Sequence, residues 1–280
     1  MRVPQSFPRR LLLEAPLLLP LLQLKLPASA QEEVVADVIP QLLSALRTEG
    51  EAAADSLSMW GAARGDSCAW AAKPTAAEYE APLPVWLAGE WRVSSKMGRV
   101  QFPLGKRFVG ELTPGVRMAS ILSLPNIGNA PSFNASFLRD VDGSVRPDRA
   151  ANQRAVLQAF WPDAAVVATE ALNGRLLLTY EAPTRRSGRI KQNVDVRLCR
   201  SVGALVSDSS WVGADVFTQD NLEQGVRGIY MVVQRYSQVG TRVSLTQRVA
   251  SFLQPTDPMY FDARGRPVAL FDYEYVLTRP

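Results

Sequence analysis

Acidic residues are the side chains of this sequence whose spacing suits acid–base chemistry, because its 280 residues include no histidine. Asp272 and Glu274 stand two positions apart in a segment that alternates like a β-strand, so both side chains leave the same face. Two carboxyls this close titrate as a coupled pair, an arrangement that general acid–base catalysis uses. The same alternation also decorates the solvated face of an ordinary strand, so we assign no catalytic residue.

The absence of histidine excludes several classes of site. Ser-His-Asp and Cys-His nucleophile systems, HExxH zinc centres and histidine-ligated haem all need imidazole. The sequence also lacks a Walker loop, a GxGxxG motif and the cysteine spacing of zinc sites. We therefore predict no metal and no cofactor.

The two cysteines, Cys68 and Cys199, form a candidate disulfide. An exported protein meets an oxidising compartment, and a bridge across so long a loop stabilises by about 4–5 kcal/mol in the chain-entropy account. Two free thiols are the alternative interpretation.

The first thirty residues have the three parts of an export signal. Arg9 and Arg10 precede a leucine-rich stretch at 11–26, and Ala28-Ser29-Ala30 follows as a small-x-small cleavage site. The stretch contains prolines and charges and is shorter than a membrane span, so we predict no transmembrane segment in the mature chain. An uncleaved amphipathic helix is the alternative.

Most of the net charge of +4 comes from this leader. Residues 1–30 hold four basic residues and one acid, which leaves the remainder at +1 with both signs interspersed. Nucleic-acid binding needs a continuous basic surface, so we predict no nucleic-acid partner.

The chain changes its periodicity near residue 84, which predicts three regions. After the leader (1–30), residues 31–83 hold one amphipathic helix over 31–47, bent or interrupted at Pro40, and an alanine-rich linker. Residues 84–280 alternate as strands separated by turn signals. The predicted strands cover 86–95, 115–122, 132–139, 165–170, 175–181, 192–199, 204–218, 228–238, 241–254 and 267–278.

One helix interrupts these strands at 148–160, with Asp148 as N-cap and Ala151, Ala155, Val156 and Phe160 on one side. The pattern predicts an all-β fold, a closed antiparallel barrel with one helix in the barrel domain and an N-terminal helical extension. Closure removes the exposed edges of a sheet. A split two-sheet sandwich is the alternative.

Aromatic residues gather on the face of the strands that we expect to point inward. In the last predicted strand, alternation places Phe271, Tyr273 and Tyr275 together, and Trp91 and Trp211 lie in other strands. A barrel of about eight strands holds one small apolar ligand in its mouth. We therefore predict these five aromatic residues as the ligand-binding set.

The opening of the first strand, Gly89-x-Trp91, resembles that of lipocalins (calycin-type barrels). There a glycine lets the chain pass under the barrel and a tryptophan closes one end. If the last strand pairs with the first, Arg279 stacks on the Trp91 indole. The resemblance thus implies that Gly89, Trp91 and Arg279 close the barrel.

Residues 84–280 also resemble a domain-of-unknown-function family of cyanobacteria and plastid-bearing eukaryotes. The stretches that carry the resemblance are PVWLAGEWRVSS (84–95), PLGKRFVG (103–110), RPDRAANQRAVLQAFW (146–161) and LQPTDPMYFDARGRPVALFDYEYVL (253–277). It implies a chloroplast protein, with the thylakoid lumen as one destination; the leader is shorter than a full bipartite transit sequence, and secretion is the alternative.

Three functions fit these observations. The first is a module that binds a small apolar ligand such as a lipid, a pigment or a quinone. The second is a non-catalytic assembly partner of a photosynthetic membrane complex. The third is an enzyme that uses carboxylates inside the barrel, by analogy with lipocalin-fold enzymes of the lumen.

Overall fold

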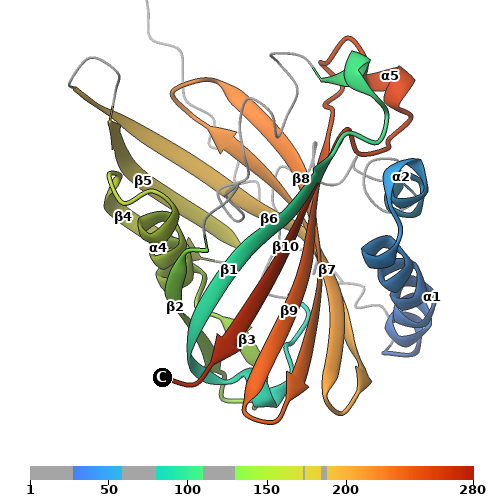
Figure 1. The fold of residues 1–280 in the computed structure, drawn as a ribbon, viewed down its shortest axis with the longest axis vertical. Coiled ribbons are helices and arrows are strands. Elements are labelled where there is room, and N and C mark those ends of the chain that lie inside the picture. The colour runs from blue at the N-terminus through green and yellow to red at the C-terminus, as the bar shows by residue number, and fades with distance from the viewer. Residues whose placement is uncertain (1–27, 59–79, 110–129, 173, 184–187) are drawn as a thin grey trace, which may run out of the picture.

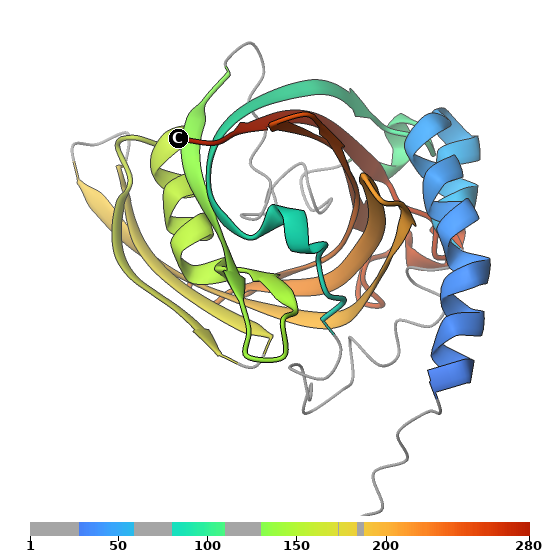
Figure 2. The ribbon, with the colours of Figure 1, turned by 90° about the horizontal axis from the view of Figure 1, so that it is seen from below.

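Ten antiparallel strands pair side by side in one sheet that curls around an apolar interior (Figures 1 and 2). The computed structural model describes residues 28–58, 80–109, 130–172, 174–183 and 188–280. The strands of this part are β1 (Gly89–Gln101), β2 (Ser132–Arg139), β3 (Val145–Pro147), β4 (Ala165–Leu172), β5 (Arg175–Pro183), β6 (Arg189–Ser207), β7 (Ser210–Asn221), β8 (Val226–Val239), β9 (Arg242–Phe252) and β10 (Ala269–Thr278). The helices are α1 (Ala28–Arg47), α2 (Gly50–Ser58), η2 (Val85–Leu87), η3 (Lys106–Phe108), α4 (Arg149–Phe160) and α5 (Tyr260–Ala263).

The sheet does not close on itself, so the prediction of a closed barrel is wrong. The strand order is β3-β2-β1-β10-β9-β8-β7-β6-β5-β4, which leaves β3 and β4 as its two ends. The chain between these strands forms α4, which contacts both β2 and β4 and lies in the gap between the sheet ends (Figure 2). A helix cannot continue the strand ladder because its backbone groups bond within it. The alternative of two separate sheets is also wrong for the described strands.

Most predicted strands overlap an observed strand, but several boundaries differ, including those of β1 and β6. The predicted strand over 204–218 is the end of β6 and most of β7, which are separated by a turn at Asp208 and Ser209. Short polar residues favour such a turn, yet the apolar residues on both sides concealed it. The short strand β3 was not predicted, and the predicted strand over 115–122 lies outside the described residues.

Strands β1 and β10 pair, as expected from the sequence, and Arg279 is the residue that follows β10 in the chain. Its guanidinium lies over the indole of Trp91, 3.8 Å from the ring centroid, and Nη1 donates to the carbonyl oxygens of Ala88 (3.0 Å) and Glu90 (3.3 Å). Gly89 has a φ of 103°, and a Cβ there would lie 2.8 Å from Nη1 of Arg279. The contact therefore needs glycine at this position.

The two faces of the sheet bury different apolar clusters. Inward residues of the strands form the interior, together with Leu83, Leu87 and Leu157 of the segments that cross it. On the outer face, α1 and α2 cover β7, β8, β9 and β10 and bury residues such as Leu42 and Leu57 (Figure 1). Strand β7 is therefore apolar on both faces, as expected for a strand covered on each side. Helix α1 runs through Pro40 without interruption.

Arg248 connects the end of helix α1 to the sheet through hydrogen bonds. It is 2% exposed, and its Nε and Nη2 donate to the two carboxylate oxygens of Asp272 on β10 at 2.5 and 2.9 Å. Its Nη1 donates to the carbonyl oxygens of Ala45 and Thr48, where α1 ends. The last carbonyls of a helix have no partner within it, and a cation there also complements the helix dipole. Arg248 therefore adds a polar contact to the apolar packing that holds α1 on the sheet.

Substitution of Arg248 by alanine tests this arrangement. We expect R248A to lower the free energy of unfolding by about 1–3 kcal/mol, because the carbonyl oxygens of Ala45 and Thr48 lose their donor. Asp272 keeps its ion pair with Arg99. Hydrogen exchange of residues 38–57 should become faster by mass spectrometry. Arg242→Ala, at an exposed position of the same strand, is the control, and equal stability of the two variants would contradict this role.

Candidate functional site

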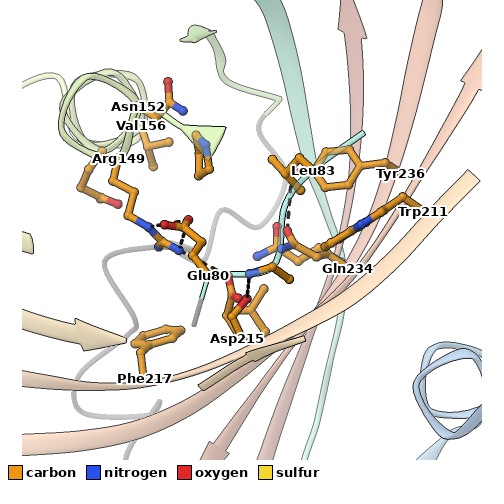
Figure 3. Close-up of a pocket in the computed structure, with 16 residues that line it drawn as sticks. Glu80, Leu83, Arg149, Asn152, Val156, Trp211, Asp215, Phe217, Gln234 and Tyr236 are labelled. Carbon is orange, nitrogen blue, oxygen red and sulfur yellow. Dashed lines mark hydrogen bonds and ion pairs between the residues drawn. The ribbon is translucent and has the colours of Figure 1, made fainter. Parts of the chain in front are cut away.

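A cavity of about 170 Å³ lies on the inner side of the sheet, between α4, the crossing segment of residues 80–83, and strands β6 to β9 (Figure 3). Its walls combine apolar and aromatic side chains with three charged residues. The lining residues are Glu80, Ala81, Leu83, Pro147, Arg149, Asn152, Gln153, Val156, Ser201, Trp211, Asp215, Phe217, Val232, Gln234, Tyr236 and Gln247. An apolar pocket with a few convergent polar groups is the usual form of a small-molecule site.

Arg149 brings a positive charge into this cavity. It is the first residue of α4, after Asp148, whose carboxylate caps the helix by accepting from the amide of Ala151 at 3.0 Å. A cation in the first turn opposes the helix dipole, so it needs carboxylate partners. Arg149 donates through Nε and Nη2 to Oε1 of Glu80 at 3.1 and 2.7 Å, and Nη2 lies 3.7 Å from Oδ2 of Asp215. Burial alone would lower the pKa of Arg149, but the two carboxylates raise it, and the guanidinium stays charged.

Asp215 supplies the second carboxylate from the middle of β7. Alternation along this strand turns Trp211, Asp215 and Phe217 inward, and Ser201 of β6 stands directly opposite Asp215. Burial raises the pKa of the Asp215 carboxyl and nearby Glu80 adds to this, while Arg149 and the Ser201 hydroxyl offset only part of the rise. Asp215 is thus a carboxyl whose negative charge is incompletely balanced.

Glu80 reaches the cavity because the crossing segment is fixed at two points. The amide of Ala81 donates to Oγ of Ser201 at 2.9 Å, and the amide of Leu83 donates to the carbonyl of Val145 at 2.9 Å. These bonds join β6 to β3 across the interior. Figure 3 shows the Arg149 side chain extending from α4 toward Glu80 and Asp215.

Trp211 forms the opposite wall, with Tyr236 beside it at 5.9 Å between ring centroids (Figure 3). Its indole lies flat against two glycines that pair across β6 and β7. A Cβ at Gly203 would lie 2.1 Å from Trp211, and one at Gly213 would lie 2.2 Å from it. Glycine at both positions therefore leaves room for the ring. Burial, with a smaller contribution from Asp215, raises the pKa of Tyr236, whose hydroxyl stays protonated.

Asn152 anchors α4 to the end of the sheet. Its side-chain oxygen accepts from the amide of Ser136 on β2 at 2.7 Å, and its Nδ2 donates to the carbonyl of the same residue at 2.9 Å. The side chain thereby satisfies backbone groups of β2 in the manner of a neighbouring strand. This pair of bonds and the Arg149 cluster hold the helix across the gap between the sheet ends.

The inner face of α4 differs from its predicted face. Gln153 and Leu157 are its buried residues, and Arg149, Asn152 and Val156 line the cavity. Ala151, which we expected on the buried side, is exposed. The apolar pattern misled because the inward side of α4 carries charged and amide side chains beside Val156 and the buried Leu157.

The five predicted ligand-binding residues are all buried in the interior cluster: Trp91, Trp211, Phe271, Tyr273 and Tyr275. Only Trp211 lines the cavity. Tyr273 and Tyr275 stack on each other at 6.0 Å, and Trp91 packs at the end of the interior, where its Nε1 donates to the carbonyl of Leu87 at 2.6 Å. Four of the five residues therefore pack within the interior cluster and do not line this cavity: Trp91, Phe271, Tyr273 and Tyr275.

The carboxyl pair Asp272 and Glu274 lies outside the interior. Asp272 is bound by Arg248 and Arg99 under the helix pair, and Glu274 is exposed on the outer face. The acids that face inward are Glu80 and Asp215, which sequence reasoning missed. An acid in a strand apolar on both sides, as at Asp215, and an arginine at the start of a helix were the available signals.

The prediction of a disulfide has a partial outcome. Cys199 is disulfide-bonded in β6, and Cys68, the only other cysteine of the chain, lies outside the described residues, as does the leader through residue 27. Among the described residues, no helix has both the length and the apolar character of a membrane span. Within the same part of the chain, no cluster of acidic residues, cysteine or histidine suits a metal ion.

Comparison with known protein families, curated proteins and solved structures finds no match to this chain. The family resemblance and the lipocalin-like opening strand therefore stay predictions.

Substitution of Asp215 by asparagine tests the charge state of the cavity. Because its pKa is raised above the ordinary value of 3.8, the folded protein holds a proton that the unfolded chain has lost in the pH range between the two values. This carboxyl therefore lowers stability as pH rises through that range, and D215N removes the contribution. We expect the free energy of unfolding of D215N, relative to that of the parent, to increase as pH rises from about 4 to the pKa of Asp215 in the folded parent protein.

Urea unfolding at a series of pH values measures this difference. Asp262→Asn, at an exposed position of α5, is the control. A D215N difference that is constant with pH would contradict the raised pKa.

Proposed function

We propose that this protein is a binding module that holds a small molecule in the cavity beside α4. The observation that carries the proposal is a cavity of about 170 Å³ on the inner side of the sheet, in which Arg149, Glu80 and Asp215 meet aromatic walls. Groups of this kind orient a ligand, because a carboxylate only accepts hydrogen bonds and a guanidinium only donates them.

The size of the cavity limits the ligand. Sites for drug-sized molecules measure about 300–1,000 Å³, whereas a cavity of about 150 Å³ holds benzene. The cavity here therefore suits a molecule with about one ring. A lipid, a pigment or a quinone fits only if its end group enters and the rest extends outside.

Binding accounts for the cavity better than catalysis does. The carboxylate enzyme considered from the sequence depended on Asp272 and Glu274, which lie on the outer face. Of the two inward acids, Glu80 is held by both Nε and Nη2 of Arg149. This carboxylate therefore serves to hold Arg149 in place.

Placement in the chloroplast, with the thylakoid lumen as one destination, belongs to this proposal. It follows from the leader and the family resemblance, and secretion is the alternative. A role as assembly partner of a photosynthetic membrane complex is the second proposal from the sequence. The outer apolar face offers it no support, since α1 and α2 cover β7 to β10.

A cavity-filling variant tests the proposal, with neutral benzyl alcohol as the probe. We expect saturable binding to the parent protein by ligand-observed NMR. Val156→Phe places a larger side chain into the cavity from α4 and should weaken binding about tenfold or more, because it occupies the same volume.

Val167→Phe, at an exposed position of β4, is the matched control and should bind like the parent. Absence of saturable binding, or equal affinity in V156F and the parent, would overturn the proposed function.

A further inference from the structure

We infer that the cavity selects a cation: its ligand carries a protonated amine that pairs with Asp215 and an apolar part that packs on Trp211 and Tyr236. This inference rests on the proposed function and names the ligand class of the same site.

The charges that line the cavity favour a cation. Two carboxylates, Glu80 and Asp215, face one guanidinium, Arg149. With all three ionised the cluster carries one net negative charge, in a setting where water screens it poorly. A ligand with one positive charge brings the net charge of this cluster to zero.

The geometry of the ion pairs indicates that the positive charge of the ligand pairs with Asp215 rather than with Glu80. Arg149 donates two hydrogen bonds to Oε1 of Glu80, at 3.1 and 2.7 Å. Asp215 lies farther from it, at 3.7 Å, and faces the Ser201 hydroxyl as well. The carboxylate of Asp215 therefore has remaining capacity to accept hydrogen bonds, and three N–H donors of an ammonium group match it.

An anionic ligand fits the same cluster poorly. To reach Arg149 it would have to displace the Glu80 carboxylate and would then lie beside Asp215. Like charges at this separation repel strongly where water is excluded. The guanidinium thus serves to hold the two acids and α4 in place.

The aromatic wall supports the same choice. Trp211 and Tyr236 pack together at 5.9 Å and line the cavity on the side opposite Arg149 (Figure 3). The face of an indole or a phenol attracts an ammonium ion and also packs against an apolar ring. Gln234 and Gln247, which pair across β8 and β9, add amide groups to this wall.

Three probes of nearly equal size and different charge test the inference: benzylamine, benzyl alcohol and benzoate at neutral pH. We expect benzylammonium to bind about tenfold or more tightly than benzyl alcohol, because a hydrogen bond to a charged partner is stronger than a neutral one. Benzoate should bind most weakly. Dissociation constants from titration calorimetry or ligand-observed NMR measure the order.

Two variants test whether Asp215 causes the preference for benzylamine. Asp215→Asn keeps the shape of the side chain and should reduce the affinity for benzylamine to that for benzyl alcohol. Binding of benzyl alcohol to D215N shows that the variant is folded. Glu274→Gln, which removes an acid from the exposed outer face, should leave all three affinities unchanged.

The outcomes separate the inference from the proposed function. Equal affinities for the three probes, tightest binding of benzoate, or a preference for benzylamine that persists in D215N overturns the inference while the cavity remains a binding site. Failure of all three probes to bind the parent overturns the proposed function itself. If D215N does not fold, the order of affinities in the parent protein decides.

Discussion

The structure depends on how α4 spans the open side of the curled sheet. Strands β3 and β4 share no backbone hydrogen bonds in the described structure, so the two sheet ends are joined by side chains of one helix. Asn152 satisfies backbone groups of β2, and Arg149 joins the helix to Glu80 and to Asp215 on β7. Without these contacts the interior would lose one of its walls, and the cavity would lose its boundary.

The charged cluster has a cost that the fold has to offset. Removing three charges from water is unfavourable unless they neutralise one another and complete their hydrogen bonds. Arg149 and Glu80 do so, whereas Asp215 does so only in part, as its raised pKa indicates. Residues that are incompletely satisfied inside an otherwise well-packed protein are the usual signature of a site that meets another molecule.

Two arginines of the described residues, Arg248 and Arg149, illustrate the difference between a structural contact and a candidate site. Arg248 donates to Asp272 and to the carbonyl oxygens of Ala45 and Thr48 at the end of α1. Arg149 balances a cluster that borders open space. The first arrangement fixes a helix pair on the outer face, and the second leaves one carboxylate available.

The sequence by itself determined the strands, the helix at α4 with Asp148 as its cap, the inward face of β10 and the stacking of Arg279 on Trp91. Each follows from a local period or from pairing of the chain ends. Tertiary structure decided the open side of the sheet, the polar inner face of α4 and the meeting of Glu80, Arg149 and Asp215. These three residues are far apart in the chain. Only the curl of the sheet brings them together, because burial and charge pairing depend on distances that no local pattern records.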